Sequence, residues 1–218
     1  MSFADNDQDN DFKAMSETRQ RLVPHLNDLQ ETVLRLLPEP REDQPYRVLD
    51  IGTGTGLMVE RVLGKIPQAQ VHLVHEERPN LDAAQDRLSN FPDQITYELA
   101  DYVRVNLDGP FDVVVQELEA SFLENKSKRT LLSAAYAALR RGGRLISIAQ
   151  VRGATDALEN YYVEQWRVMA GEQGASENEL ERAVFTSAKD RTATLAQQLD
   201  WMAADGFENT DCYVKYWR

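Results

Sequence analysis

The chain contains a single cysteine, Cys212, and lacks any long run of apolar residues. One cysteine excludes an internal disulfide and a cysteine-based zinc site, which agrees with a reducing compartment. No stretch reaches the roughly 18 consecutive apolar residues that a membrane-spanning helix needs. The first residues, Met-Ser-Phe-Ala-Asp-Asn-Asp, have neither the basic region nor the apolar segment of an export signal. The sequence therefore predicts a cytoplasmic protein without a membrane partner.

Basic residues are scarce relative to acidic ones. The 218 residues include 24 Lys and Arg against 36 Asp and Glu, a formal net charge of −12. Residues 1–11 are acidic and poor in apolar side chains, which predicts a disordered tail. A polyanion would be repelled by this charge, and the cluster of Arg140, Arg141 and Arg144 is too small to reverse it. We expect no nucleic-acid partner.

A glycine-rich loop directly follows a short apolar run. Residues 48–56 read Val-Leu-Asp-Ile-Gly-Thr-Gly-Thr-Gly, and helical spacing resumes at Leu57. This pattern predicts a buried parallel strand and a strand-to-helix turn in which the missing Cβ atoms let a ligand lie against the backbone. It differs from the G-x-G-x-x-G loop of dinucleotide-binding folds, because Asp50 stands two residues before the first glycine. A carboxylate there would repel a pyrophosphate and attract an ammonium, which favours a cofactor with an amino-acid end and an adenosine end.

These residues resemble the loop of the Rossmann-like, class I S-adenosylmethionine-dependent methyltransferases, and the resemblance extends over residues 12–218. It implies S-adenosylmethionine as the cofactor, with Asp50 at the methionyl amino group. The methionine and ribose would lie on the loop that contains Gly52, Thr53, Gly54 and Gly56. The chain is similar to the small-molecule methyltransferases and to the carboxy-S-adenosylmethionine synthase branch. That synthase needs arginines for a carboxylate partner, and the cleft loops do not clearly supply them, so methyl transfer to a small molecule is the preferred function.

Strands and helices alternate along the sequence. Strands are predicted at 46–51, 70–75, 94–98, 111–116 and 144–150, and helices at 57–65, 79–89 and 126–140. Helices of this length between strands require right-handed crossovers and a mainly parallel sheet with helices on both faces. We therefore predict a doubly wound α/β fold in a single domain over residues 12–218, whose ligands bind beyond the carboxyl ends of the strands.

The ends of the second and third strands are expected to contact the adenosine. In the family, an acid after the second strand accepts from both ribose hydroxyls, but here His75 occupies that position and Glu76 follows it. We expect Glu76 to bind the ribose, with the His75 imidazole as the alternative acceptor. Asp101 and Tyr102 resemble the family's acid and aromatic at the adenine, and the alternative is that Asp101 caps a turn.

The fourth strand leads into a segment without the histidine pair that many relatives carry there. It delivers Gln116, an expected cofactor contact, and then the carboxylates Glu117 and Glu119. Transfer from a sulfonium leaves a neutral thioether, so alignment is the main demand and a base is needed only when the acceptor must lose a proton. Exposed loop acids usually have no catalytic role. Glu117 and Glu119 are therefore the available bases, but the catalytic residue stays unassigned.

Helical segments are expected to cover the cleft from two sides. Residues 12–37 place apolar residues at helical spacing on both sides of Pro24, and residues 151–190 form a helical insertion after the fifth strand. We expect the acceptor site between these segments. Its predicted lining is Arg19, Tyr161, Tyr162 and Trp166. Alternatively, the three aromatic residues form the core of a helical lid.

The last predicted elements are a helix at 190–204 and a strand at 211–216. Relatives continue into an antiparallel strand beside the fifth strand, whereas this sequence stops at Arg218. Either the sheet is one strand short, or an edge is left for another subunit, which makes a homodimer one expectation. His75, the missing histidine pair and the short end also leave open a degenerate cofactor-binding protein.

Overall fold

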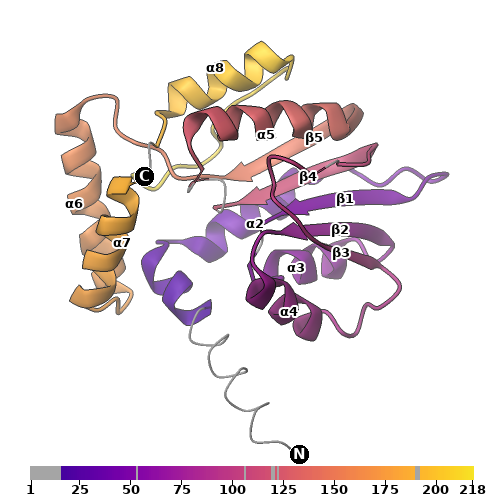
Figure 1. Ribbon diagram of the computed structural model, residues 1–218, viewed down its shortest axis with the longest axis horizontal. Helices are drawn as coiled ribbons and strands as arrows, with labels where there is room; N and C mark the ends of the chain where they lie inside the picture. The colour runs from indigo at the N-terminus through magenta and orange to yellow at the C-terminus, as the bar shows by residue number, and fades with distance from the viewer. Residues whose placement is uncertain (1–15, 53, 106, 119–120, 122, 190–191) are drawn as a thin grey trace, which may run out of the picture.

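The computed structural model describes residues 16–52, 54–105, 107–118, 121, 123–189 and 192–218. A five-stranded sheet lies at its centre, with helices above and below it in Figure 1. The strands are β1 (Tyr46–Ile51), β2 (Ala69–His75), β3 (Ile95–Leu99), β4 (Phe111–Glu117) and β5 (Leu139–Ile148). The helices are α2 (Leu26–Leu36), α3 (Leu57–Lys65), α4 (Arg78–Arg87), α5 (Asn125–Ala138), α6 (Asp156–Glu172), α7 (Glu177–Lys189) and α8 (Leu195–Asp205), and residues 16–22 are also helical.

The strand order is β3-β2-β1-β4-β5, and every pairing is parallel. This confirms the predicted doubly wound fold. The chain winds outward from β1 to β3 on one side and then returns to place β4 on the other side of β1. The carboxyl ends of β1 and β4 therefore form the topological switch point, where open α/β sheets bind their ligands.

Two apolar layers cover the faces of the sheet. Along β1, Val48 belongs to a buried cluster with α2, α3 and α4, and Leu49 belongs to a second cluster with α5. This alternation follows from the period of two in a strand. Both side chains are at most 1% exposed, and fully burying such a side chain contributes roughly 1.5 to 3 kcal/mol. Helix α8 packs on the outer side of α5, where Ser133 donates to Asp205 at 2.7 Å.

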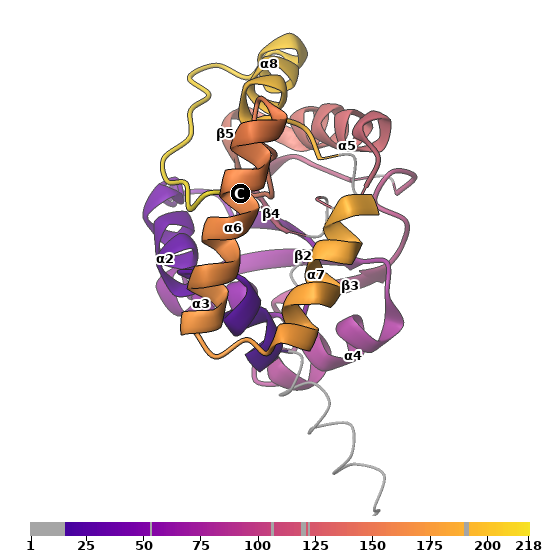
Figure 2. The ribbon, with the colours of Figure 1, turned by 90° about the vertical axis from the view of Figure 1, so that its left-hand side faces the viewer.

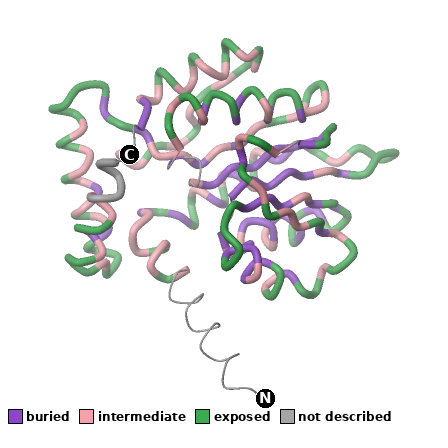
Figure 3. The backbone as a smooth tube through the Cα atoms, viewed as in Figure 1, coloured by how far each residue is buried: buried purple, intermediate pink, exposed green. Residues whose placement is uncertain are grey.

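The α6–α7 pair and residues 16–22 lie together beyond the carboxyl edge of the sheet (Figure 2). Trp166 and Leu180 from the pair are buried against each other, and Leu22 packs on them. The Trp166 Nε1–H donates to the Leu22 carbonyl at 2.8 Å. Figure 3 shows that β1, β2 and β4 are mostly buried, whereas α6 and the described side chains of α7 are mostly intermediate or exposed. None of the helices in the described ranges is long and apolar enough to cross a membrane.

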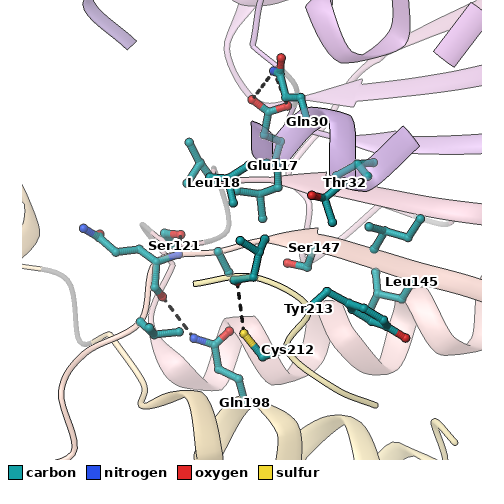
Figure 4. A pocket seen from close by; sticks show the side chains of 18 of the residues that line it. Gln30, Thr32, Glu117, Leu118, Ser121, Leu145, Ser147, Gln198, Cys212 and Tyr213 are labelled. Carbon is teal, nitrogen blue, oxygen red and sulfur yellow. Dashed lines mark hydrogen bonds between the residues drawn. The ribbon is translucent and has the colours of Figure 1, made fainter. Parts of the chain in front are cut away.

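The predicted strand at 211–216 is wrong, because these residues form no ladder in the structure. Burial does alternate along them, since Cys212 and Val214 are half-buried and Tyr213 is 66% exposed. Alternating burial shows only that one face of the segment is covered by other residues. A strand also needs a neighbouring backbone with which to form hydrogen bonds. The segment instead lies across a hollow from β5, as Figure 4 shows. All five strands of the described residues are therefore parallel, with β5 at an edge.

The observed starts of one helix and one strand also differ from the predicted ones. Helix α8 begins at Leu195 rather than at residue 190, because Thr194 and Gln197 form a reciprocal capping box there. Strand β5 begins at Leu139, directly where α5 ends, rather than at 144. The expected tail at 1–11 lies outside the described residues.

Candidate cofactor site

The glycine loop joins β1 to α3 at the switch point. Gly52, Gly54 and Gly56 have φ values of 72°, 63° and 78°, a region that residues with a Cβ rarely adopt. A Cβ on Gly56 would lie 3.3 Å from the Ala84 Cα atom of α4. A Cβ on Gly54 would lie 2.7 Å from the Nη1 atom of Arg19. The loop therefore packs against α4 at one end and lies under Arg19 at the other, while the expected contact Thr53 lies outside the described residues.

Asp50 lies in the middle of the sheet just before this loop. Its side chain is 0% exposed, and in register it stands between Leu73 of β2 and Val115 of β4. Burial of a carboxylate in such surroundings is costly without a positively charged or hydrogen-bonding group close by. This position suits the ammonium of an amino-acid ligand.

His75 ends β2 as a buried, neutral hydrogen-bond donor. Its Nδ1 accepts from the Glu77 N–H at 2.9 Å, and its side chain is 1% exposed. Burial and then the positive charge of Arg19 lower the pKa of His75 to about 4. The ring therefore carries its proton on Nε2, which has no hydrogen-bond partner among the described residues. We expected this imidazole to accept a hydrogen bond from the ribose. That direction is wrong, because Nδ1 is already occupied and the remaining nitrogen, Nε2, is a donor.

Glu76 bridges the ends of β2 and β3. Its side chain is exposed, and Oε1 accepts from the Tyr102 N–H at 3.0 Å. The Tyr102 ring packs edge-on against His75, with ring centroids 6.0 Å apart, and is only 3% exposed. Tyr102 thus belongs to the core below the site. Asp101 is exposed and caps a turn, since its Oδ1 accepts from the Val103 N–H at 2.9 Å.

Glu117, the last residue of β4, is buried rather than exposed. Its side chain faces Gln30 of α2, whose Nε2 donates to both carboxylate oxygens at 3.2 Å (Figure 4). Arg19 Nη2 lies 3.1 Å from Oε1 and also donates to the Glu117 carbonyl at 3.3 Å. Burial raises the pKa of Glu117, while Arg19 and Gln30 oppose that change. Gln116 is also buried, in register between Ile51 and Ser147, whereas Glu119 lies outside the described residues.

Of the four residues expected at the acceptor site, Arg19 and Trp166 line one cavity, whereas Tyr161 and Tyr162 do not. Arg19 reaches the glycine loop. Trp166 forms the core of the α6–α7 pair, which agrees with the alternative that the aromatic residues are the core of a helical lid. Tyr161 and Tyr162 pack instead on the C-terminal Trp217, with ring centroids 5.5 and 6.3 Å away. These two tyrosines therefore pack α6 against the C-terminal end of the chain.

A cavity of about 2060 Å³ is lined by Arg19, Gly54 and Glu117 at its cofactor end. It runs from Gly54 and Glu117, past Ser121 and Gln150, into the hollow between β5 and residues 208–216. Ser121 Oγ accepts from the Gln150 N–H at 2.9 Å, which ties the segment after β4 to the end of β5. No group of His, Cys, Asp and Glu within the described ranges could hold a metal ion.

Gln30 is a site residue that the sequence analysis missed. It is 1% exposed and is held on its other side by Arg61 Nη1, which donates to Oε1 at 3.0 Å. The available signal was its place in the apolar stripe of α2, between the buried residues Leu26 and Val33. A polar residue in such a stripe must find a buried partner.

The glycine loop and four of the five strands fall within a recognised family. Residues 48–143 match the family described as a methyltransferase domain. The malonyl-[acyl-carrier protein] O-methyltransferase of Magnetococcus marinus is 32% identical over 107 residues, which cover 49% of this chain and 38% of that protein. The enzyme of the same description from Halalkalibacterium halodurans is 27% identical over 103 residues, 44% of this chain and 38% of that protein. The chain thus spans well under half the length of these curated relatives.

Solved methyltransferase structures share the fold. The phosphoethanolamine N-methyltransferase 2 of Haemonchus contortus, solved with S-adenosyl-L-methionine, has a TM-score of 0.65 at 20% identity and covers 91% of this chain and 42% of that one. A putative methyltransferase from Bacillus halodurans has a TM-score of 0.59 at 21% identity and covers 82% of this chain and 68% of that one. The family match over residues 48–143, the parallel sheet order and the acid before the glycine loop together support a class I S-adenosylmethionine-dependent methyltransferase.

Proposed function

We propose that this chain transfers a methyl group from S-adenosylmethionine to a small-molecule acceptor. The observation that carries the proposal is the buried carboxylate of Asp50 directly before three positive-φ glycines at the switch point. Asp50 would bind the methionyl ammonium, and the loop backbone would underlie the methionine and ribose. The His75 Nε2–H would donate to a ribose oxygen, and Glu76 would accept from a ribose hydroxyl. Asp101, exposed after β3, would accept from the adenine amino group.

The bound cofactor would supply an electrophilic methyl on a sulfonium. The departing thioether is neutral, so the protein needs no acid to assist it. The described residues offer no ready base at the end of β4, because Glu117 is enclosed by Arg19 and Gln30. We therefore propose an acceptor whose nucleophile is already free at neutral pH, such as a carboxylate or an unprotonated amine. The malonyl carrier named in the descriptions of the relatives carries a carboxylate, which favours that class.

Two measurements test this proposal. Isothermal titration with S-adenosylhomocysteine should give saturable binding, and transfer of a labelled methyl group should be detected with a panel of carboxylic acids and amines. Alcohols and phenols of similar size should not react, because they must lose a proton. Methylation of a phenol with a rate that rises through one deprotonation would contradict the acceptor class. Binding without transfer to any acceptor, with S-adenosylhomocysteine co-purifying, would favour the non-catalytic alternative.

We also propose a cytoplasmic location and a homodimer. The single cysteine supports a reducing compartment. Among the described residues, no further strand pairs with the outer edge of β5, and an open edge offers backbone donors and acceptors to a second subunit. Sedimentation velocity over a wide concentration range should resolve a two-fold mass, and a monomer throughout that range would exclude the dimer.

A further inference from the structure

The cleft contains a buried carboxylate that the proposed transfer does not use. Glu117 is 2% exposed at the end of β4. A buried charge needs a partner, because its desolvation costs several kcal/mol otherwise. The partner here comes from residues 16–22, far from β4 in sequence, and Gln30 supplies the second donor. The arrangement therefore connects the segment that precedes α2 to the floor of the cofactor cleft.

Arg19 extends from this carboxylate toward the glycine loop. Its Nη2 contacts the carboxylate and the backbone oxygen of Glu117, while its Nη1 lies 2.7 Å from the position of a Cβ on Gly54. A guanidinium has donors on more than one edge and can bind two acceptors in a fixed geometry. The second arginine at the loop, Arg87, is directed elsewhere, since it donates to the Thr55 carbonyl and to Glu60.

The two ends of an amino acid need opposite charges. Asp50 offers a carboxylate to the ammonium, so the carboxylate of the same ligand needs a cation beside the loop. We propose that Arg19 binds the carboxylate at the amino-acid end of the cofactor, and that Glu117, together with Gln30, is the positioning residue that aims Arg19 there. This inference rests on the proposed cofactor. It assigns Glu117 a role other than that of a base, and it brings Arg19, from the segment before α2, into the cofactor site.

The test compares two ligands that differ in a single group. S-adenosylhomocysteine carries the amino-acid carboxylate, and its decarboxylated analogue S-adenosyl-3-thiopropylamine keeps the adenosine, the thioether and the amine. In calorimetric titration, Arg19→Met should weaken the binding of S-adenosylhomocysteine by about tenfold to hundredfold. This is the range expected for a lost charge-assisted hydrogen bond. Its affinity for the decarboxylated analogue should change by less than about threefold. Arg19→Lys should restore part of the lost affinity, because it keeps the charge but loses the two-edged geometry.

Two further variants separate positioning from general structure. Glu117→Gln keeps a polar side chain of the same size but removes the charge that holds Arg19, so it should lose affinity selectively for the ligand with a carboxylate. Arg21→Met is the matched control, because Arg21 lies on the same segment and pairs with Glu179 at 2.7 Å. It should bind both ligands like the parent. Thermal unfolding of each variant shows whether the fold is kept, and Arg19→Met tests the proposal without altering β4.

Four results would overturn the inference. If Arg19→Met binds both ligands like the parent, or weakens both equally, Arg19 does not recognise the carboxylate. If Glu117→Gln binds S-adenosylhomocysteine like the parent, Glu117 does not position Arg19. A parent protein that binds neither ligand would remove the proposed cofactor and this inference together, which distinguishes that failure from a failure of Arg19 alone.

Discussion

At the scale of single residues, Gly54 is the most sensitive position of the loop. It has a φ of 63°, and a side chain would project toward Arg19. Gly54→Val should abolish S-adenosylhomocysteine binding in calorimetry, because a branched side chain fills the space above the loop and strains the backbone. Gly64→Ala is the matched control, since nothing lies within 4 Å of its added Cβ in α3. It should bind normally and raise the free energy of unfolding by up to about 1 kcal/mol. Normal binding by Gly54→Val would mean that the loop is only structural.

His75 should make stability depend on pH. Its pKa of about 4 in the folded protein lies below the ordinary 6.5, so the unfolded chain binds a proton first as the pH falls. The free energy of unfolding should therefore decrease from about pH 6.5 down to about pH 4, by roughly 3 kcal/mol from this residue. Denaturant titrations of His75→Gln should show a shallower loss over the same interval. An identical slope in parent and variant would mean that the imidazole is not neutral when buried.

Glu76 gives a third prediction at this scale. Its Oε1 already accepts from Tyr102, so Oε2 is the oxygen expected to meet the ribose. Glu76→Ala should weaken the binding of S-adenosylhomocysteine about tenfold, because one charge-assisted hydrogen bond is lost. Glu77→Ala, one residue further on, should have little effect on affinity. The ribose assignment would be excluded if Glu76→Ala were neutral while His75→Gln weakened binding.

At the scale of elements, the α6–α7 pair should be stabilised mainly through residues 16–22. Trp166→Phe keeps one aromatic ring but removes part of the buried indole and the hydrogen bond to the Leu22 carbonyl, which is worth about 1 kcal/mol. We expect faster amide hydrogen exchange in residues 16–22 and in the α6–α7 pair, with unchanged protection in β1. Equal loss of protection in β1 would show that the pair unfolds together with the sheet.

The sequence was sufficient for the sheet because its signals are local and strong. Apolar runs such as Val48–Ile51 predict buried parallel strands, and the helices between them require crossovers, whereas the order of the strands was not predicted. The site was predicted less well. Glu117 was treated as an exposed loop acid, because nothing near it in sequence shows that Gln30 and Arg19 enclose it. The strand at 211–216 failed for a similar reason, since alternation cannot reveal whether a neighbouring backbone is present.

At the scale of the whole molecule, the charge of −12 sets the range of partners. Such a field repels a polyanion much more strongly than a small acceptor that carries at most one or two charges. A tRNA pool should therefore fail to bind in a filter assay at moderate salt. Binding that persists there, with an affinity that falls steeply against salt concentration on a log-log plot, would refute the small-molecule assignment.

Residues 16–22 contact both the floor of the cleft and the α6–α7 pair. Arg19 reaches Glu117 and Arg21 reaches Glu179. We therefore expect this short helical stretch to lie across the route by which a cofactor would leave. Opening the route means breaking both ion pairs and the Trp166 contact, whereas the chemical step breaks none of them. Turnover should then be governed by product escape, which predicts a burst of one methylated product per active site before the steady state and a steady rate that falls as solvent viscosity rises.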